Sequence, residues 1–343
     1  MSMREQVQDL WRTCFDDDEC FVELYFRLRY TDDINRAIEV DGKIVSALQA
    51  IPYPMTFCGR TISSSYISGA CTHPDYRARG VMKQLLLDTH RTMFNEGIMI
   101  AMLIPAEEWL KGYYARSGYT TCFRYGLKKV INSSVQPVDN SASSLIINKI
   151  DLIETPDSIL YPYFNSQMNR RSCCVQHTAE DFHIIVADLT LSGGDVWMVS
   201  REGRMCGLVL CLIQGDNLSV KELLLSEESD ASVVFCKLFE YYRAEVIECI
   251  VPLASDMHEL GMARIVDVFA CMEAFSASYS GEPFYFHVEG DEAIPQNNGY
   301  YTLLPGRLIR EYDESYTYVT YTISELTAWV MADLHPYMSL MLN

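Results

Sequence analysis

The spacing of hydrophobic residues divides the first third of the chain into alternating helices and strands. Val7, Leu10, Trp11 and Cys14 recur every three or four positions, as on the buried side of a helix. Asp16–Asp18 can cap a second helix, expected over 21–30. The pattern therefore predicts a helical N-terminal region.

Strands and further helices are expected next. Asp41-Gly42 stands between two apolar runs, which is typical of a hairpin turn, so 36–40 and 44–51 are predicted as paired antiparallel strands. In chain order, the pattern then predicts a strand over 62–71, a helix over 81–94, a strand over 98–104 and a short helix over 109–116.

A polar stretch separates this region from a second one with a similar order. Residues 132–145 are rich in Asn, Ser, Pro and Asp and have no apolar period, which indicates a linker. The following elements are predicted as a helix over 179–191, a strand pair within 196–213, a strand over 217–225, a helix over 232–242 and a strand over 246–251. This order favours an internal duplication, with chance similarity of two hairpins as the alternative.

The last part of the chain has a different pattern. Three strands are expected over 284–289, 300–304 and 316–322, followed by a helix over 323–331 capped by Thr322 or Ser324. We expect a small α+β domain here, and a mixed α/β and α+β fold for the whole chain.

Charge and cysteine content limit the possible functions. Lys and Arg number 27 against 46 Asp and Glu, a net charge of −19, which disfavours a nucleic-acid partner. The 12 cysteines form no CxxC pair and no zinc-ligand spacing, so we expect no metal. No apolar run approaches the ~18 residues of a membrane helix, and no signal-peptide pattern opens the chain. We therefore expect a cytoplasmic protein without a membrane partner.

The most informative segment joins a strand to a helix. Gly69–Thr72 ends the strand, and a turn containing His73 leads to Arg77 and Arg79 just before Gly80 opens the helix. A helix N-terminus offers unpaired N–H groups and a partial positive charge, so this arrangement suits a phosphate-bearing ligand. Alone, Gly80 is equally compatible with an ordinary turn.

This segment resembles the acyl-CoA motif of the GCN5-related N-acetyltransferases (GNAT), Arg/Gln-x-x-Gly-x-Gly/Ala. Met82 departs from the pattern, because the motif has Gly or Ala at that position. The resemblance implies the acyl-CoA N-acyltransferase fold and acetyl-CoA as cosubstrate. The residues that it implies for binding are Ala70, Cys71, Thr72, Arg77, Ala78, Arg79, Gly80, Val81 and Met82.

A second block narrows the resemblance to the Eis-type (enhanced intracellular survival) acetyltransferases. The block runs Tyr114-Ala115-Arg116-Ser117-Gly118-Tyr119. The resemblance implies two tandem GNAT folds and a C-terminal domain like sterol carrier protein 2. We accordingly expect a catalytic domain over 1–131, the linker over 132–145, a second GNAT-like domain over 146–263 and the C-terminal domain over 264–343.

The second GNAT-like domain is expected to lack the cofactor. Where the first copy has arginines and Gly80, the second has Glu227, Glu228 and Asp230 and no glycine. Carboxylates at a helix N-terminus would repel a pyrophosphate. One CoA site per chain is therefore predicted.

Two catalytic groups are implied by the resemblance. Tyr114 would donate a proton to the departing thiolate, with ordinary packing as the alternative. The C-terminal carboxylate of Asn343 would enter the active site as base, with Leu340 to Leu342 anchoring the tail; the alternative is that the tail only packs. His73 and His90 are not favoured as catalysts, and His90 is expected at a surface or interface.

The leading hypothesis is an acetyl-CoA-dependent N-acetyltransferase acting on a primary amine. The acidic balance, with Glu107 and Glu108 close to Tyr114, suits a polycationic acceptor, and the resemblance offers aminoglycosides or polyamines as examples; a peptide is also compatible. Glu107 and Glu108 are equally compatible with a solvated helix cap. The alternative function is a non-catalytic protein that binds CoA or a lipid-type ligand. The resemblance also implies a homo-oligomer.

Overall fold

The computed structural model describes residues 1–134, 145–152 and 155–342. The helices are α1 (Met3–Cys14), α2 (Glu19–Leu28), α3 (Val81–Asn95), α4 (Glu108–Ala115), α5 (Asp157–Met168), α6 (Ala179–Leu191), α7 (Ala231–Tyr242), α8 (Val268–Ser276) and α9 (Ile323–Met331). Short 3₁₀ helices are η1 (Pro74–Tyr76), η2 (Asn132–Ser134), η3 (Glu228–Asp230) and η4 (Pro295–Asn297).

Most strands belong to one long sheet. They are β1 (Asn35–Val40), β2 (Lys43–Phe57), β3 (Arg60–Thr72), β4 (Ile100–Leu103), β5 (Thr120–Ile131), β6 (Leu145–Lys149), β7 (Cys174–Val175), β8 (Asp195–Arg201), β9 (Arg204–Gln214), β10 (Asn217–Leu225), β11 (Val246–Val251) and β12 (Met257–Ile265). A separate sheet holds β13 (Phe284–Val288), β14 (Gly299–Leu304), β15 (Arg307–Ile309) and β16 (Val319–Tyr321). Most of the predicted elements are found with shifts of a few residues at their ends, but β2 extends six residues beyond the predicted end at 51.

The long sheet contains the same supersecondary unit twice. In the first unit β3 is followed by α3 and the parallel strand β4; in the second, β10 is followed by α7 and the parallel strand β11. Each parallel pair is preceded by an antiparallel hairpin, β2–β3 or β9–β10. The repeated order agrees with the internal duplication expected from the sequence.

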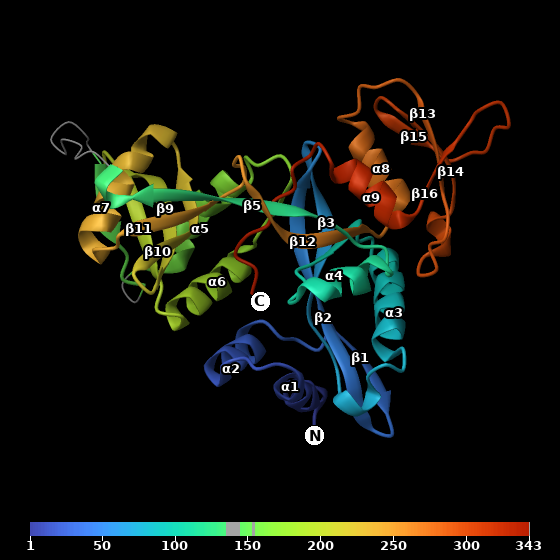
Figure 1. The fold of residues 1–343 in the computed structure, drawn as a ribbon, viewed down its shortest axis with the longest axis horizontal. Helices are drawn as coiled ribbons and strands as arrows, with labels where there is room; N and C mark the ends of the chain where they lie inside the picture. Colours follow the sequence, from blue (N-terminus) through green and yellow to red (C-terminus); the bar gives the residue numbers. More distant parts are fainter. Residues whose placement is uncertain (135–144, 153–154, 343) are drawn as a thin grey trace.

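The two units exchange strands, and this joins them into one sheet. The order across the sheet is β1-β2-β3-β4-β12-β5-β11-β10-β9-β8-β6 (Figure 1). Strand β5, which follows the first unit, pairs with β11 of the second, while β12, which follows the second unit, pairs with β4 of the first. The boundary expected at 263/264 therefore falls inside a strand, β12, that is paired to the first unit.

The C-terminal region forms a smaller layer beside the first unit (Figure 1). Helices α8 and α9 bury Cys271, Met272, Leu326 and Val330 in a core shared with the second sheet. Thr322 caps α9 in a capping box with Glu325, as the sequence predicted. The strand expected over 316–322 is shorter, Val319–Tyr321.

Two general features of the described residues bear on function. None of the helices in this part of the chain combines the length and the apolar character needed to span a bilayer. Likewise, no three His, Cys, Asp or Glu side chains among residues 1–134, 145–152 and 155–342 are grouped so as to hold a metal ion.

Candidate active site

The end of β3 has no neighbouring strand on one side. Strand β3 pairs with β4 only from Ser64 to Tyr66, yet continues to Thr72. The pairing with β2 shifts by one residue next to Gly69, which marks a β-bulge. Gly69 has φ +57°, and a Cβ there would collide with the ring of Trp11 and the side chain of Gln49. The bulge thus depends on glycine, and the last residues of β3, Ala70 to Thr72, lie beyond the stretch that pairs with β4.

The turn after β3 exposes a helix N-terminus. Gly80 is the N-cap of α3 in the left-handed region, at φ +78°, and no side chain hydrogen-bonds to this end of the helix within the described residues. Arg77 and Arg79 are exposed beside it. The Nε of Arg77 donates to the carbonyl of Thr72 at 3.0 Å, and the guanidinium of Arg79 lies 5.3 Å from the ring centre of Tyr76. The predicted residues 70–72 and 77–82 therefore lie in one continuous loop-and-strand site.

Met82, the departure from the motif, does not point into this turn. Its half-buried side chain packs against the core cluster that contains Leu85, Leu86 and Tyr114. The bulky residue at this position is therefore accommodated by the core beneath α3.

A cysteine that sequence reasoning missed lies beneath this turn. The Sγ of Cys14 is 3.4 Å from the carbonyl of Thr72. A hydrogen bond with Cys71, reinforced by Arg77, lowers the pKa of the Cys14 thiol to about 6, whereas the pKa of Cys71 is raised well above its usual value. The sequence did not indicate that Cys14 lies near this turn, because Cys14 is far from the motif in sequence and fits the apolar pattern of α1.

Tyr114 lies in the core beneath the divergence of β3 and β4. It is 8% exposed, and its ring contacts Tyr113 and Tyr119 with centroids 5.5 and 5.9 Å apart. Burial, with smaller contributions from Tyr113 and Cys71, raises the pKa of Tyr114 to about 12. The phenol is therefore protonated at neutral pH and retains a proton that it can donate.

The C-terminal tail threads between the two units. Tyr337 joins β7 through backbone hydrogen bonds to Cys173 and Val175, each 3.0 Å long. Leu342 is buried against Leu24 of α2 and Ile184 of α6. Figure 1 shows the tail, in red, running toward α6. Asn343, the predicted catalytic terminus, lies outside the described residues.

A buried ion pair anchors the tail. Glu222 of β10 binds Arg171 through two hydrogen bonds of 2.9 and 3.0 Å and accepts hydrogen bonds from the hydroxyls of Tyr337 (3.1 Å) and Ser339 (2.5 Å). His177 also contacts the backbone oxygen of Ser339 at 2.9 Å. Of the apolar anchors that the sequence predicted, Leu342 is buried, whereas Leu340 and Met341 are only half-buried. Polar anchors were missed because their partners lie more than a hundred residues away in sequence.

The expectation that His90 lies at a surface or interface is wrong. His90 is fully buried within α3, and its Nε2 lies 2.9 Å from the hydroxyl of Tyr119. Burial lowers its pKa well below the usual value, so the ring is neutral. Through this contact His90 positions the hydroxyl of Tyr119, which ends the block that begins with Tyr114. The helical pattern of α3 did not decide the side of His90, because a histidine is compatible with either face.

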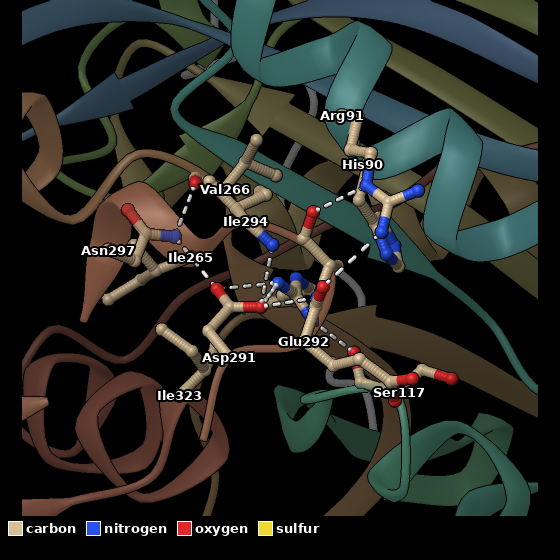
Figure 2. Close-up of polar contacts among 12 residues, drawn as sticks. His90, Arg91, Ser117, Ile265, Val266, Asp291, Glu292, Ile294, Asn297 and Ile323 are labelled. Atoms are coloured by element: carbon tan, nitrogen blue, oxygen red, sulfur yellow. Dashed lines mark hydrogen bonds and ion pairs between the residues drawn. The ribbon is translucent and has the colours of Figure 1, made fainter. Parts of the chain in front are cut away.

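Beside His90, a second buried ion pair fixes the C-terminal region to the first unit (Figure 2). Arg264 of β12 binds both carboxylate oxygens of Asp291, at 2.6 and 2.8 Å, and donates to the carbonyl of Ser117 at 2.5 Å. Asn297 donates to Asp291 at 2.9 Å, and Arg91 of α3 donates to the carbonyl of Ala293 at 3.0 Å. These contacts fix the position of the block 114–119 and of α3 relative to the C-terminal region.

The first unit also matches a known domain family. Residues 2–122 match the sequence model of the family described as "Acetyltransferase (GNAT) domain". This match places a GNAT acetyltransferase domain in the first unit, and such a domain supports a transferase. Among curated proteins no significant match is found.

Solved structures extend the comparison over nearly the whole chain. A protein of Enterococcus faecalis V583, described as a probable N-acyltransferase, is 15% identical, with 97% of this chain and 88% of that chain covered and a TM-score of 0.80. A GCN5-related N-acetyltransferase of Anabaena variabilis is 15% identical, with 97% and 96% covered and a TM-score of 0.75. Eis1 of Mycobacterium abscessus is 14% identical, with 96% and 88% covered and a TM-score of 0.74. At these identities the likeness shows a shared fold.

Proposed function

We propose that this protein transfers the acetyl group of acetyl-CoA to a primary amine. The observation that carries the proposal is the free end of β3, which leads through an arginine-bearing turn into the uncapped N-terminus of α3 and lies near the buried phenol of Tyr114. Free strand groups suit the amide groups of a pantetheine arm, and the helix end suits a pyrophosphate. In this proposal the first unit holds one acetyl-CoA per chain.

The chemistry is a direct transfer. The neutral amine attacks the thioester carbonyl, so that a C–N bond forms and the C–S bond breaks. A backbone N–H of residues 70–72 stabilises the developing oxyanion, and Tyr114 gives its proton to the departing thiolate. The proposed base is the carboxylate of Asn343, which accepts the proton that the amine loses. The burial of Leu342 between α2 and α6 supports a tail end held inside the molecule.

The proposal includes three further features. We propose that the second unit binds no CoA, because its turn carries Glu227, Glu228 and Asp230. We also propose that the C-terminal region is a domain like sterol carrier protein 2, and that the protein forms a homo-oligomer in the cytoplasm. The acceptor is an amine-bearing small molecule or peptide.

Calorimetry and turnover on the untagged protein test the proposal. Acetyl-CoA is expected to bind at about one per chain, and a panel of primary amines is expected to release CoA thiol. Tyr114→Phe is expected to retain acetyl-CoA affinity and to lower kcat by about a hundredfold, a typical loss for a removed proton donor.

The matched control is Tyr113→Phe, the neighbouring half-buried tyrosine, which should turn over as the wild type does. A folded protein that does not bind acetyl-CoA would refute the proposal. Binding without turnover of any amine would instead favour the non-catalytic alternative.

A further inference from the structure

A cavity of about 370 Å³ lies between the two units, and its lining includes none of the residues proposed to bind acetyl-CoA or to transfer its acetyl group. Ile104, just beyond β4, and Tyr125 of β5 line it from one side, and one face of α6 lines it from the other. The tail residues Met338 to Leu342 complete the wall. Its size and largely apolar lining are typical of a small-molecule site.

Two ionisable side chains of opposite sign line this apolar cavity. Asp188 lies on α6, and Lys221 lies on β10. The pairing of β10 with β9 shifts by one residue between Val220 and Glu222, so Lys221 is the extra residue of a bulge. A bulge breaks the alternation of side chains along a strand. As a result, Lys221 lines the cavity beside Ser339 while Glu222, the next residue, also contacts Ser339.

Neither charge is satisfied by the protein. Within residues 1–134, 145–152 and 155–342, the side chains of Asp188 and Lys221 have no hydrogen bond or ion pair. Both are half-buried, and burial raises the pKa of Asp188 and lowers the pKa of Lys221. A partly desolvated charge without a partner is unfavourable, so a ligand that brings both counter-charges would relieve both costs.

We propose that this cavity binds a zwitterion of amino-acid type, with an apolar body, a carboxylate that faces Lys221 and an ammonium group that faces Asp188. The apolar lining, for example Leu189, Leu212 and Ile250, would hold the body. A polycation would be repelled by the positive charge of Lys221, and a fatty acid would leave the carboxylate of Asp188 without a counter-charge. This inference goes beyond acetyl transfer and does not depend on it.

The test uses three probes with the same aromatic body. L-phenylalanine carries both charges, phenethylamine only the cation and 3-phenylpropanoate only the anion. Each is titrated calorimetrically into the full chain without acetyl-CoA. L-phenylalanine is expected to bind about tenfold or more tightly than either relative, since each lost charge-assisted contact costs at least that factor.

Two variants assign the charges. Lys221→Met should abolish the preference for L-phenylalanine over phenethylamine, and Asp188→Asn should abolish the preference over 3-phenylpropanoate. Both variants should fold, because each removes a half-buried charge without a partner. Lys237→Met is the matched control, because this half-buried lysine of α7 pairs with Glu240 and does not line the cavity; it should leave every affinity unchanged.

The outcomes separate this inference from the proposed function. Absence of L-phenylalanine binding, equal binding of the three probes, or unchanged preferences in the two variants would overturn the zwitterion site. Binding of L-phenylalanine by a protein that does not bind acetyl-CoA would instead refute the proposed function and leave the site standing.

Discussion

The turns that follow β3 and β10 have the same frame but opposite chemistry. Each follows a bulged strand and a short 3₁₀ helix, and each leads into a helix next to a parallel strand. In the first, Gly80 leaves the helix end open just after the exposed Arg77 and Arg79. In the second, the corresponding Asp230 is buried and accepts a hydrogen bond from Arg201 at 2.7 Å. The backbone alone therefore does not make an anion site. The side chains at the helix end determine whether an anion can bind there.

The second unit uses the same strand for a different purpose. At its bulge, Glu222 holds the C-terminal tail through Tyr337 and Ser339, and Arg171 neutralises it. The bulge of the first unit carries no charged side chain and leaves its strand end free. A duplicated frame thus serves the proposed cosubstrate in one copy and the tail in the other.

The largest expected effect comes from breaking the tail anchor. Glu222→Ala leaves the guanidinium of Arg171 without its partner in a mostly buried site and should lower the free energy of unfolding by about 3–5 kcal/mol. Urea denaturation measures this. The control Glu228→Ala, an exposed glutamate three residues beyond the end of β10, should change it by less than about 0.5 kcal/mol.

A loss below about 1 kcal/mol for Glu222→Ala would contradict the anchoring role. Tyr337→Phe sharpens the result, because it removes one hydrogen bond to the carboxylate and keeps the ring. It should cost about 1–3 kcal/mol, as expected for a lost hydrogen bond to a charged group.

These tests also show what local patterns reveal and what they hide. The hairpin at Asp41-Gly42, helix α3 and the turn around Gly80 were predictable, because each depends on residues close in sequence. The exchange of β5 and β12 was not predictable, since the apolar pattern of each strand is compatible with pairing in the first unit or in the second. The pairs of Glu222 with Arg171 and of Arg264 with Asp291 join distant segments, so only the folded chain brings them together.

A smaller effect is expected from giving the first turn the chemistry of the second. Arg77→Glu with Gly80→Asp introduces the residues found at Glu227 and Asp230. Replacing attraction by repulsion beside the pyrophosphate should weaken acetyl-CoA binding about a hundredfold, which calorimetry measures. Loss of the left-handed glycine should cost only about 1 kcal/mol of stability.

The reverse charge change in the second unit is the control. Glu227→Arg alters an equally exposed position and should leave both the affinity and the stoichiometry of acetyl-CoA unchanged. Equal weakening by both changes would show that overall charge, and not the first turn, governs binding.

The smallest expected effect concerns Cys14, which lies beneath the first turn. Because the pKa of Cys14 is lowered to about 6, whereas Asp18 raises the pKa of the exposed Cys20, Cys14 is the more readily deprotonated of the two thiols near pH 7. Iodoacetamide should therefore label Cys14 about tenfold faster than Cys20 at pH 7, despite its partial burial.

The folded state binds this proton less readily than the unfolded state, so the associated stability is present at high pH and is lost as the pH falls through about 6. Arg77→Glu should move the labelling midpoint to higher pH; a midpoint that stays in place would show that Arg77 does not stabilise the thiolate.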